Sequence, residues 1–424
     1  MVGGGPGAFI GSVHRMALAL DGGFELAAGA FSASSERSRA AGAELGLARE
    51  RTYASFTEMA EAEAGSDSER RIDLAVIVTP NHLHTAAAAA FLERGVAVAC
   101  DKPLATRLED AEKLVKLAAG RRRYGDPAPD PTSPGARSLP LGMVTYNYSG
   151  YPMVKEARAL VRTGRIGEVR KVIVEYVQGW LANLLEAPEN AGEPGFKQAE
   201  WRSDPTRGGP SPVLGDIGTH AHHLLRYVTG LEPERIFAKL SAQVPGRLVH
   251  DDATVLLELA GGATGLLHAS QVATGERNHL RIRVYGSEGG IDWRQETPEE
   301  LRLLKPDGST TVLHRAAGAT SPAAGRASRL PGGHPEGFIE GFANLYAAFG
   351  ADLRRDRTAP ENSSPDERRS DEETDYPTFE DGAAGVRFVE QAVESAESGN
   401  WVDAGAVFPD GPTDRSPDTS RDSP

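Results

Sequence analysis

Two segments of the sequence bring together side chains that can hold and move protons. Lys102 lies just beyond the apolar run Val96–Cys100, which predicts a buried strand. Asp216 and His220 are four residues apart at the start of a predicted helix, so they share one of its faces. An imidazole can accept a hydroxyl proton near neutral pH, and an ammonium can stabilise a developing negative charge. These residue types suit chemistry at a hydroxyl-bearing carbon.

Each of these residues also has an ordinary structural explanation. Asp216 can serve as the N-cap that opens its helix, which is the commonest role of aspartate at that position. His220, with His222 and His223, can be a packing or surface residue. A metal site is not expected, because no cysteine or carboxylate spacing completes a ligand set. Taken singly, these residues favour structural roles, and only their combination with other motifs points to catalysis.

The chain opens with a glycine-rich segment, Gly3-Gly-Gly-Pro-Gly-Ala-Phe-Ile-Gly11, and a helix is predicted to continue over His14–Leu20. Glycines here allow a tight turn and a close approach to a pyrophosphate at the helix N-terminus. A flexible terminus is the alternative. Only Met1 and Val2 precede Gly3, so we expect either that most of the first strand is missing or that the natural start lies upstream. Both would weaken the cofactor site.

The residues after the predicted strand Phe24–Phe31 bear on the choice of dinucleotide. Folds of this type commonly place a carboxylate there, which binds the ribose 2′-hydroxyl of NAD. Here the position is Ser32, and Arg37 or Arg39 follows near enough to meet a 2′-phosphate. The alternative is that the serines of this segment merely cap the next helix. The sequence leaves both NAD and NADP open.

The pattern of apolar runs predicts an α/β protein with two domains. The first 120 residues alternate short strands and helices, as in a parallel sheet flanked by helices; the predicted elements are Phe24–Phe31, Ser35–Leu45, Ile72–Val78, Thr85–Arg94, Val96–Cys100 and Leu108–Ala119. Met143–Tyr148 is predicted as a strand that enters the second domain. Longer strands there predict a mostly antiparallel sheet: Val169–Val177, Arg235–Val244, Ala253–Leu259, Ala263–Val272, His279–Tyr285 and Leu301–Leu304. Irregular insertions are predicted at about 121–140 and 354–375, a helix at Phe379–Ser398, and a disordered tail at 409–424.

Composition narrows the class of protein. A net charge of −14 disfavours nucleic-acid partners, which need a basic surface. The longest apolar runs fall short of the roughly 20 residues that cross a bilayer, and no export signal opens the chain. Cys100 is the single cysteine, which excludes an internal disulfide and favours the reducing cytoplasm.

Four motifs occur in an order that resembles the Gfo/Idh/MocA oxidoreductases. They are the glycine-rich start, Thr79-Pro80-Asn81-His82-Leu83-His84, Asp101-Lys102-Pro103 and Asp216-Ile-Gly-Thr-His220. The resemblance covers nearly the whole chain outside the insertions and the tail. It implies an N-terminal Rossmann dinucleotide-binding domain over residues 1–145. A C-terminal α/β domain over residues 146–408 would carry a large open, mostly antiparallel sheet that joins a homo-dimer or homo-tetramer. The main departures from the family pattern are the short first strand, the longer glycine loop and Asp101 in place of a glutamate.

The resemblance also assigns a site, position by position. Lys102, Asp216 and His220 match the family's catalytic residues. Cofactor contacts are expected from Gly3, Gly5, Ala8, Phe9, Ile10, Gly11, Ser32, Arg37, Thr79, Pro80, Asn81, His84, Asp101, Lys102, Trp201 and Arg202. Substrate contacts are expected from Tyr146, Asn147, Tyr148, Trp180 and His223.

The implied activity is an NAD(P)-dependent dehydrogenase that acts on CH–OH groups of a sugar or polyol. His220, with a pKa near the working pH, is the expected base, and Lys102 would bond the reacting oxygen. Lys102 as the base would need its pKa to fall by about 3 units, so it is the second assignment. Two other functions stay open: a glycosidase that uses tightly held NAD for transient oxidation, and a sensor that binds the cofactor without catalysis.

Overall fold

The computed structural model describes residues 1–66, 70–119, 142–204, 207–318, 320–358 and 374–405. The predicted insertion at 121–140, most of the one at 354–375 and the tail at 409–424 lie outside these residues. The start of the second insertion is corrected, because residues 354–358 still belong to a long helix, α10. Among the described residues, no helix is both long and apolar enough to cross a membrane.

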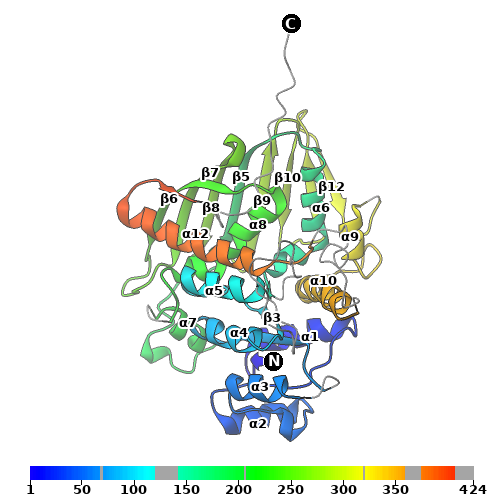
Figure 1. Cartoon of the computed structure of the whole chain (residues 1–424). Helices are drawn as coiled ribbons and strands as arrows, with labels where there is room; N and C mark the ends of the chain where they lie inside the picture. Colours follow the sequence, from blue (N-terminus) through cyan, green and yellow to red (C-terminus); the bar gives the residue numbers. More distant parts are fainter. Residues whose placement is uncertain (67–69, 120–141, 205–206, 319, 359–373, 406–424) are drawn as a thin grey trace, which may run out of the picture.

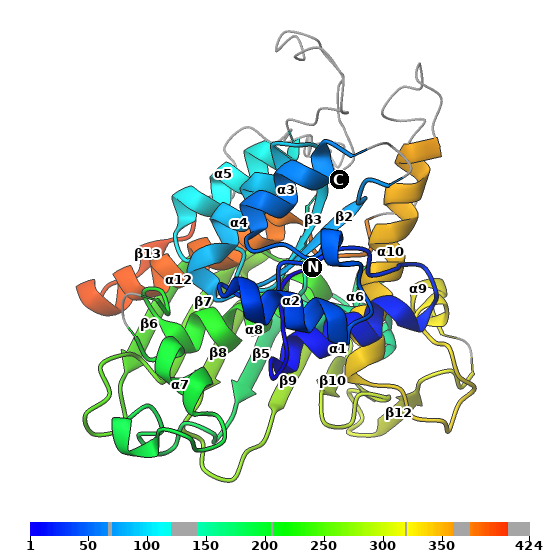
Figure 2. The ribbon, with the colours of Figure 1, turned by 90° about the horizontal axis from the view of Figure 1, so that it is seen from below.

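A four-stranded parallel sheet with the order β1-β2-β3-β4 organises the first part of the chain. Its elements are β1 Val2–Gly3, α1 Phe9–Leu20, α2 Ser35–Glu44, α3 Phe56–Ala64, β2 Leu74–Val78, α4 His84–Leu92, β3 Ala97–Cys100, α5 Leu108–Ala119 and β4 Gly142–Val144. Strands β2 and β3 are continuous apolar runs because both faces of the sheet are covered. Figure 2 shows them between α4 and α5 on one side and α10 on the other.

The strand expected at Phe24–Phe31 is wrong over most of its length. Only Gly29 and Ala30 pair, as isolated bridges to Thr52 and Val2. Gly29 and Ala30 exchange backbone hydrogen bonds with the segments 51–53 and 1–3. Because β1 has only two residues, its neighbour has no longer edge to pair with and forms no continuous strand.

A nine-stranded sheet organises the second part, with the order β12-β11-β10-β9-β5-β8-β7-β6-β13. Its strands are β5 Val169–Val177, β6 Pro233–Ser241, β7 Asp252–Leu259, β8 Thr264–Ser270, β9 His279–Gly286, β10 Gly290–Arg294, β11 Glu300–Leu304, β12 Thr310–His314 and β13 Val402–Asp403. All neighbours pair antiparallel except β5 and β8, which confirms the predicted open, mostly antiparallel sheet. Gly261 and Gly262, both with positive φ, turn the chain between β7 and β8.

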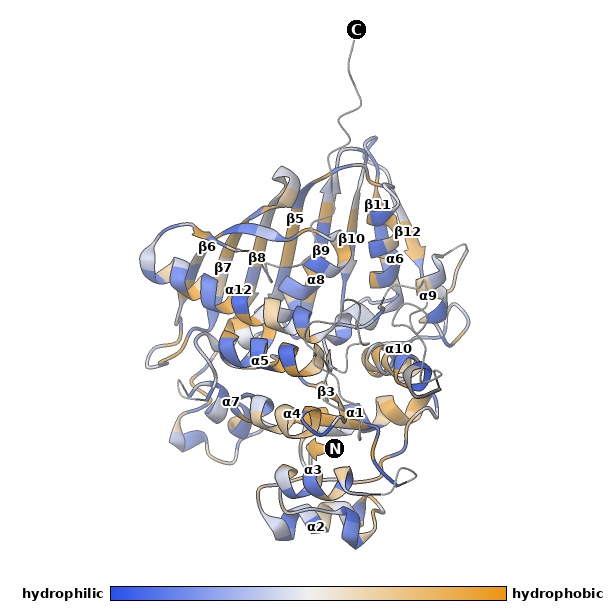
Figure 3. Ribbon diagram, viewed as in Figure 1, coloured by the Kyte–Doolittle hydropathy of each residue, from blue (hydrophilic) through white to orange (hydrophobic). Residues whose placement is uncertain are grey.

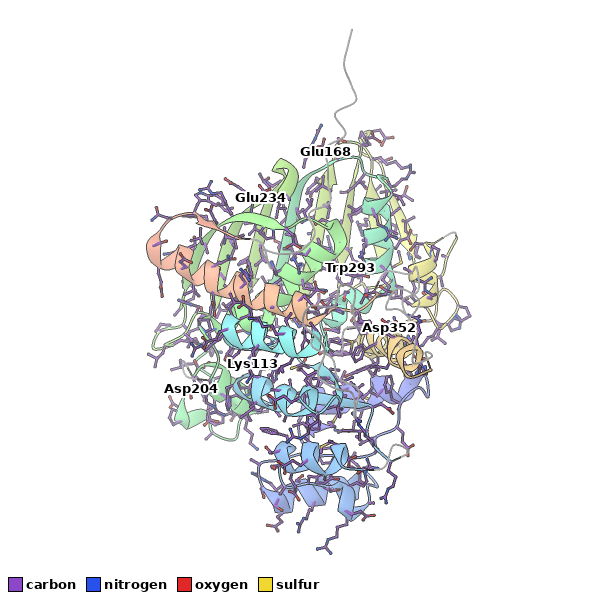
Figure 4. All side chains as sticks on the ribbon, viewed as in Figure 1. Lys113, Glu168, Asp204, Glu234, Trp293 and Asp352 are labelled. Carbon is purple, nitrogen blue, oxygen red and sulfur yellow. The ribbon has the colours of Figure 1, made fainter. Side chains whose placement is uncertain are left out.

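Helices cover one face of this sheet (Figure 1). The second part contains the helices α6 Pro152–Arg162, α7 Phe196–Arg202, α8 Thr219–Thr229, α9 Pro322–Arg326, α10 Phe338–Thr358 and α12 Phe379–Ser398, of which α6, α8 and α12 pack on the sheet. Helix α6 packs on β10 and β11, α8 on β5, β8 and β9, and α12 on β6. Figure 3 shows apolar residues concentrated along the strands, and Figure 4 shows Trp293 of β10 at this sheet, where its side chain is fully buried.

The C-terminal helices α10 and α12 pack into the core of the first sheet. Phe342, Tyr346 and Phe349 of α10, and Phe379 of α12, belong to the same apolar cluster as strands β2 and β3. Helix α1 packs along α10, and α5 packs along α12. The domain boundary at residue 145 therefore stays a prediction. In the fold, the C-terminal helices pack against the first sheet although they follow that boundary in the chain.

Candidate functional site

A cleft of about 1480 Å³ runs from the glycine-rich segment to the helix-covered face of the large sheet. The segments that follow β1, β2 and β3 all open into it, as expected for the carboxyl edge of a parallel sheet. The three expected catalytic residues, Lys102, Asp216 and His220, all line this cleft.

The glycine segment is shaped for close backbone approach. Gly3 has a φ of +77°, and a Cβ built on it would lie 2.6 Å from the Val78 carbonyl oxygen. Gly11 does not line the cleft; it lets α1 pack against the loop, since its Cβ would lie 2.4 Å from the Cα of Gly4. Helix α1 begins at Phe9 after Ala8, which provides no side-chain cap to the first-turn amides. These N–H groups fit a pyrophosphate, so the residues present suit a dinucleotide.

Ser32 and Arg37, two of the expected cofactor contacts, line the end of the cleft beside α2, together with Ala40 and Phe56. Ser34 accepts a hydrogen bond from the Arg37 amide and so caps α2, as the alternative explanation required. Ser32 instead accepts from the Ser34 amide at 3.2 Å and keeps its place on the cleft wall. Helix capping therefore explains the presence of Ser34 but not that of Ser32.

Lys102 and Asp216 form an ion pair that joins the two parts of the chain. The Lys102 ammonium donates to the Asp216 carboxylate oxygen Oδ1 at 2.7 Å and to the Asp216 carbonyl oxygen at 2.6 Å. The other carboxylate oxygen accepts from Gln271 at 2.8 Å and lies 3.3 Å from Arg202 Nε. Burial opposes ionisation of Asp216, but the charges of Arg202 and Lys102 outweigh it and hold its pKa well below the usual range.

Asp216 does not open its helix as the N-cap, which corrects that part of the prediction. It lies in a π-helical turn, Leu214–Gly218, in which the Thr219 amide bonds to the Leu214 carbonyl. Helix α8 begins at Thr219 and ends at Gly230, which has a φ of +70°. Such turns are frequent at functional sites, because they displace side chains from the ordinary helical register.

His220 stands in an aromatic pocket at the bottom of the cleft. Its ring centroid lies 4.9 Å from that of Tyr148, 5.5 Å from Tyr146 and 6.0 Å from Tyr176. Burial, with the Lys102 charge, lowers the pKa of His220 well below its ordinary value. The expectation of a pKa near the working pH is therefore corrected: His220 is neutral at pH 7. Its Nδ1 atom is buried without a hydrogen-bond partner among the described residues.

A network of hydroxyl and amide groups lies beside His220. The Tyr148 and Tyr176 hydroxyls are 2.6 Å apart, and Asn278 bonds to both of them. Gln178 donates to the same Asn278 side chain at 2.7 Å. Sequence reasoning named Tyr148 but missed the other three, which also line the cleft with Gln295. Tyr176 and Gln178 are two residues apart at the end of β5, so alternation along that strand was a signal that could have found them.

Some predicted residues lie behind the cleft wall. Tyr146 is fully buried, and its ring stacks on His223 at 4.6 Å, so both support His220 from behind. His84 places its ring nitrogens 2.7 Å from the Pro103 carbonyl and 2.9 Å from the Thr79 carbonyl, which ties two cleft segments together. By contrast, the remaining predicted residues line the cleft: Gly3, Gly5, Ala8, Phe9, Ile10, Thr79, Pro80, Asn81, Asp101, Asn147, Trp180, Trp201 and Arg202.

One buried arginine holds the segment that directly follows Trp180. Arg247 donates to the carbonyls of Leu181 and Asn183, each at 2.8 Å, and to both oxygens of Glu186. It also donates to Asp251 at 3.0 Å. The Arg247 side chain is 0% exposed, so these bonds are shielded from water. In the described ranges, no group of three or more His, Cys, Asp or Glu residues is arranged to hold a metal ion.

Comparison with known proteins gives a consistent result. Residues 1–124 match the oxidoreductase family with an NAD-binding Rossmann fold, and residues 154–292 match the GFO/IDH/MocA C-terminal domain. The uncharacterized oxidoreductase YfiI of Bacillus subtilis (strain 168) is 30% identical over 411 residues, which covers 95% of each chain.

Solved structures agree over a similar length. An oxidoreductase from Sinorhizobium meliloti is 41% identical, with a TM-score of 0.78 over 95% of this chain and 98% of that one. An inositol dehydrogenase homolog from Azotobacter vinelandii complexed with NAD+ is 34% identical, with a TM-score of 0.82 over 95% and 96%. A structure of such a homolog with NADH and myo-inositol gives 33% and 0.81 over the same shares.

Proposed function

The chain belongs to the GFO/IDH/MocA family of oxidoreductases, and from this premise we propose that it transfers a hydride at one hydroxyl-bearing carbon of a cyclic polyol, with Lys102, Asp216 and His220 around that carbon. It is an NAD(P)-dependent dehydrogenase of CH–OH groups in sugars, polyols or related compounds. One observation carries the proposal: the Lys102–Asp216 ion pair lies beside a neutral His220 in a cleft that continues to the glycine segment.

The roles follow from the hydrogen-bonding capacity of the three groups. When bound, the nicotinamide accepts or returns the hydride. The Lys102 ammonium has three N–H donors, and Asp216 accepts two of them, which leaves one for the reacting oxygen. His220 is neutral and so has one nitrogen free to accept a proton. Because Nδ1 is enclosed, Nε2 is the atom that takes the proton from the substrate hydroxyl.

Asp216 acts through Lys102. Its carboxylate is held ionised by Arg202 and Lys102, so it does not exchange protons at neutral pH. It orients the ammonium across the junction between the two parts of the chain. Lys102 donates two hydrogen bonds to Asp216, whereas His220 has a nitrogen free to accept a proton, which supports His220 rather than Lys102 as the base.

A cyclic polyol is supported by the groups beside His220. Tyr148, Tyr176, Gln178 and Asn278 present hydroxyls and amides that can bond several substrate hydroxyls at once. The buried side-chain nitrogen of Asn147 has no partner among the described residues and adds another donor. The Azotobacter relative, which was solved with myo-inositol, supports the same class of substrate.

The uncovered face of the large sheet supports self-association. Phe237, Leu256, Leu266 and Ile173 are register partners across β6, β7, β8 and β5, and so form an apolar row on this face. Leu256 is 44% exposed. A second copy would bury this row, so we propose a homo-dimer or homo-tetramer joined through the sheet. The buried, unpaired Cys100 supports a reducing cytoplasm as the working compartment.

The test is a turnover screen of cyclic polyols and aldoses with NAD+ and NADP+, followed by the absorbance of the reduced nicotinamide. We expect turnover with at least one cyclic polyol, and its loss in His220→Gln. If the cofactor binds but no nicotinamide is reduced with any substrate, the result would support the sensor function. Cleavage of glycosides without net reduction of the nicotinamide would support the glycosidase function. Light scattering of the full chain tests the assembly, since a monomer would contradict it.

A further inference from the structure

The end of the cleft beside α2 has a distinctive charge pattern. Arg37 lies on the first turn of α2 and lines the cleft, and no ion pair joins it to another described residue. Ser32 and Ala33 complete the wall next to it. Two residues after the paired Ala30, the chain therefore places the Ser32 hydroxyl where an NAD site places a carboxylate, and Arg37 adds a cation to the same wall.

Acidic groups are kept away from this end. Among the described residues that line the cleft, Asp101 and Asp216 are the only acidic ones, and both lie at the opposite end. Asp101 accepts from Thr145, and Asp216 is paired with Lys102. Glu36, next to Arg37 in the chain, is exposed and does not line the cleft. A carboxylate that would repel a phosphate here is therefore missing from the described wall.

We propose that this end of the cleft binds a ribose 2′-phosphate through Arg37 and Ser32, so that the enzyme uses NADP in preference to NAD. The proposal rests on the proposed function, because it names which dinucleotide that oxidoreductase takes. Arg37 supplies a guanidinium, the group that matches phosphate oxygens best. The first-turn amides of α2 add a positive potential on the same side. The preference separates this chain from the Azotobacter relative, which was solved with NAD+ and with NADH.

Calorimetric titration of the full chain with NADP+ and NAD+ gives the direct measurement. Because a hydrogen bond to a charged group contributes enough for a tenfold change or more, we expect the Kd of NADP+ to be at least about tenfold lower than that of NAD+. The fragments 2′,5′-ADP and 5′-AMP, titrated in the same way, should show the same order.

Three variants locate the preference. Arg37→Ala should raise the Kd of NADP+ by about tenfold or more and leave the Kd of NAD+ within about twofold. Ser32→Asp should reverse the preference, and its carboxylate can still accept the Ser34 amide that Ser32 now binds. Arg39→Ala is the matched control, since Arg39 is an exposed arginine on the same helix that does not line the cleft.

The outcomes separate this inference from the proposed function. Equal affinities for the two dinucleotides, tighter binding of NAD+, or equal losses for both in Arg37→Ala would overturn the NADP assignment and leave the oxidoreductase in place. Binding of neither dinucleotide would overturn both. An effect of Arg39→Ala as large as that of Arg37→Ala would show that overall charge, and not this wall, sets the affinity.

Discussion

Asp216 accepts two hydrogen bonds from Lys102, one at its carboxylate and one at its own carbonyl oxygen. Lys102 follows β3 of the parallel sheet, and Asp216 lies in the π-helical turn before α8. The ammonium is therefore fixed by groups that only the assembled fold brings together. A lysine on a flexible stem gains from this arrangement the fixed position that electrostatic stabilisation of a reacting oxygen requires.

Replacing Lys102 should test that role. In Lys102→Met we expect kcat to fall by about 10²–10³, the usual cost of one lost donor at a developing oxyanion. The Kd of the dinucleotide should rise by much less than kcat falls, because the glycine segment is untouched. Part of the effect is a loss of stability, since Asp216 keeps Arg202 but loses its closest cation. Steady-state kinetics with a melting curve separates the two, and a kcat within tenfold of wild type would contradict the role.

His220 should set the acid limb of the pH profile. Burial lowers its pKa well below 6.5, so kcat/KM for oxidation should stay flat from about pH 8 to pH 6.5 and fall only in more acidic solution. His220→Gln should lower kcat by about 10²–10⁴ and remove that limb. His222→Gln is the matched control, because His222 stacks on Phe388 at 4.4 Å and does not line the cleft. A limb that persists in His220→Gln would assign the proton to another group.

Local patterns predicted the elements best. The strand Val169–Val177 and the helices Leu108–Ala119 and Phe379–Ser398 have the predicted bounds. In each of them the spacing of apolar residues within the segment itself indicates the element. The strand at Phe24–Phe31 failed because its extent depends on the two-residue β1 beside it. Strands β10 and β12 were missed although they pair with neighbouring strands of the chain, because each has only five residues and β12 lies at the sheet edge without an apolar run.

Local patterns also predicted some of the site residues and missed others. Motifs in single segments located Lys102, Asp216 and His220, and the cleft brings all three together. Gln271 and Asn278 could not be found that way. They reach the site because β8 and β9 both pair with β5, and no local spacing reports such a register. The π-helical turn at Asp216 also has no signal in the spacing of apolar residues.

Buried histidines should make the fold sensitive to mild acid. Burial lowers the pKa of His14 and of His223 to about 4, from an ordinary value of 6.5. Between these values the unfolded chain binds more protons than the folded chain, so stability is full above pH 6.5 and falls as the pH drops toward 4. Each such histidine should cost about 1 kcal/mol between about pH 7.5 and pH 5.5. Urea unfolding at the two values measures the loss.

His14→Gln offers the control for that measurement. The amide can keep a hydrogen bond to Tyr346, whose hydroxyl lies 2.6 Å from His14 Nδ1, but it has no proton to bind in the unfolded chain. The variant should therefore lose less stability than wild type over the same change in pH. An equal or greater stability at the lower pH in wild type would refute the linkage.

Arg247 should position the substrate end of the cleft without touching substrate. Four of its hydrogen bonds hold the segment Leu181–Glu186, and a fifth goes to Asp251. The segment lies between Trp180 and α7, which carries Trp201 and Arg202. Arg247→Gln would leave Glu186 and Asp251 without their buried partner, so we expect a loss of about 3–5 kcal/mol in the free energy of unfolding. In the folded fraction, KM for the polyol should rise more than kcat falls, because Lys102 and His220 keep their places.

Arg235→Gln is the matched comparison for Arg247. Arg235 pairs with Glu258 across β6 and β7, and its side chain is 43% exposed, so its loss should change stability by less than about 1 kcal/mol. Its KM and kcat should equal those of wild type. If Arg247→Gln lowered kcat with an unchanged KM, the segment would act on the chemical step, and a role confined to substrate positioning would be wrong.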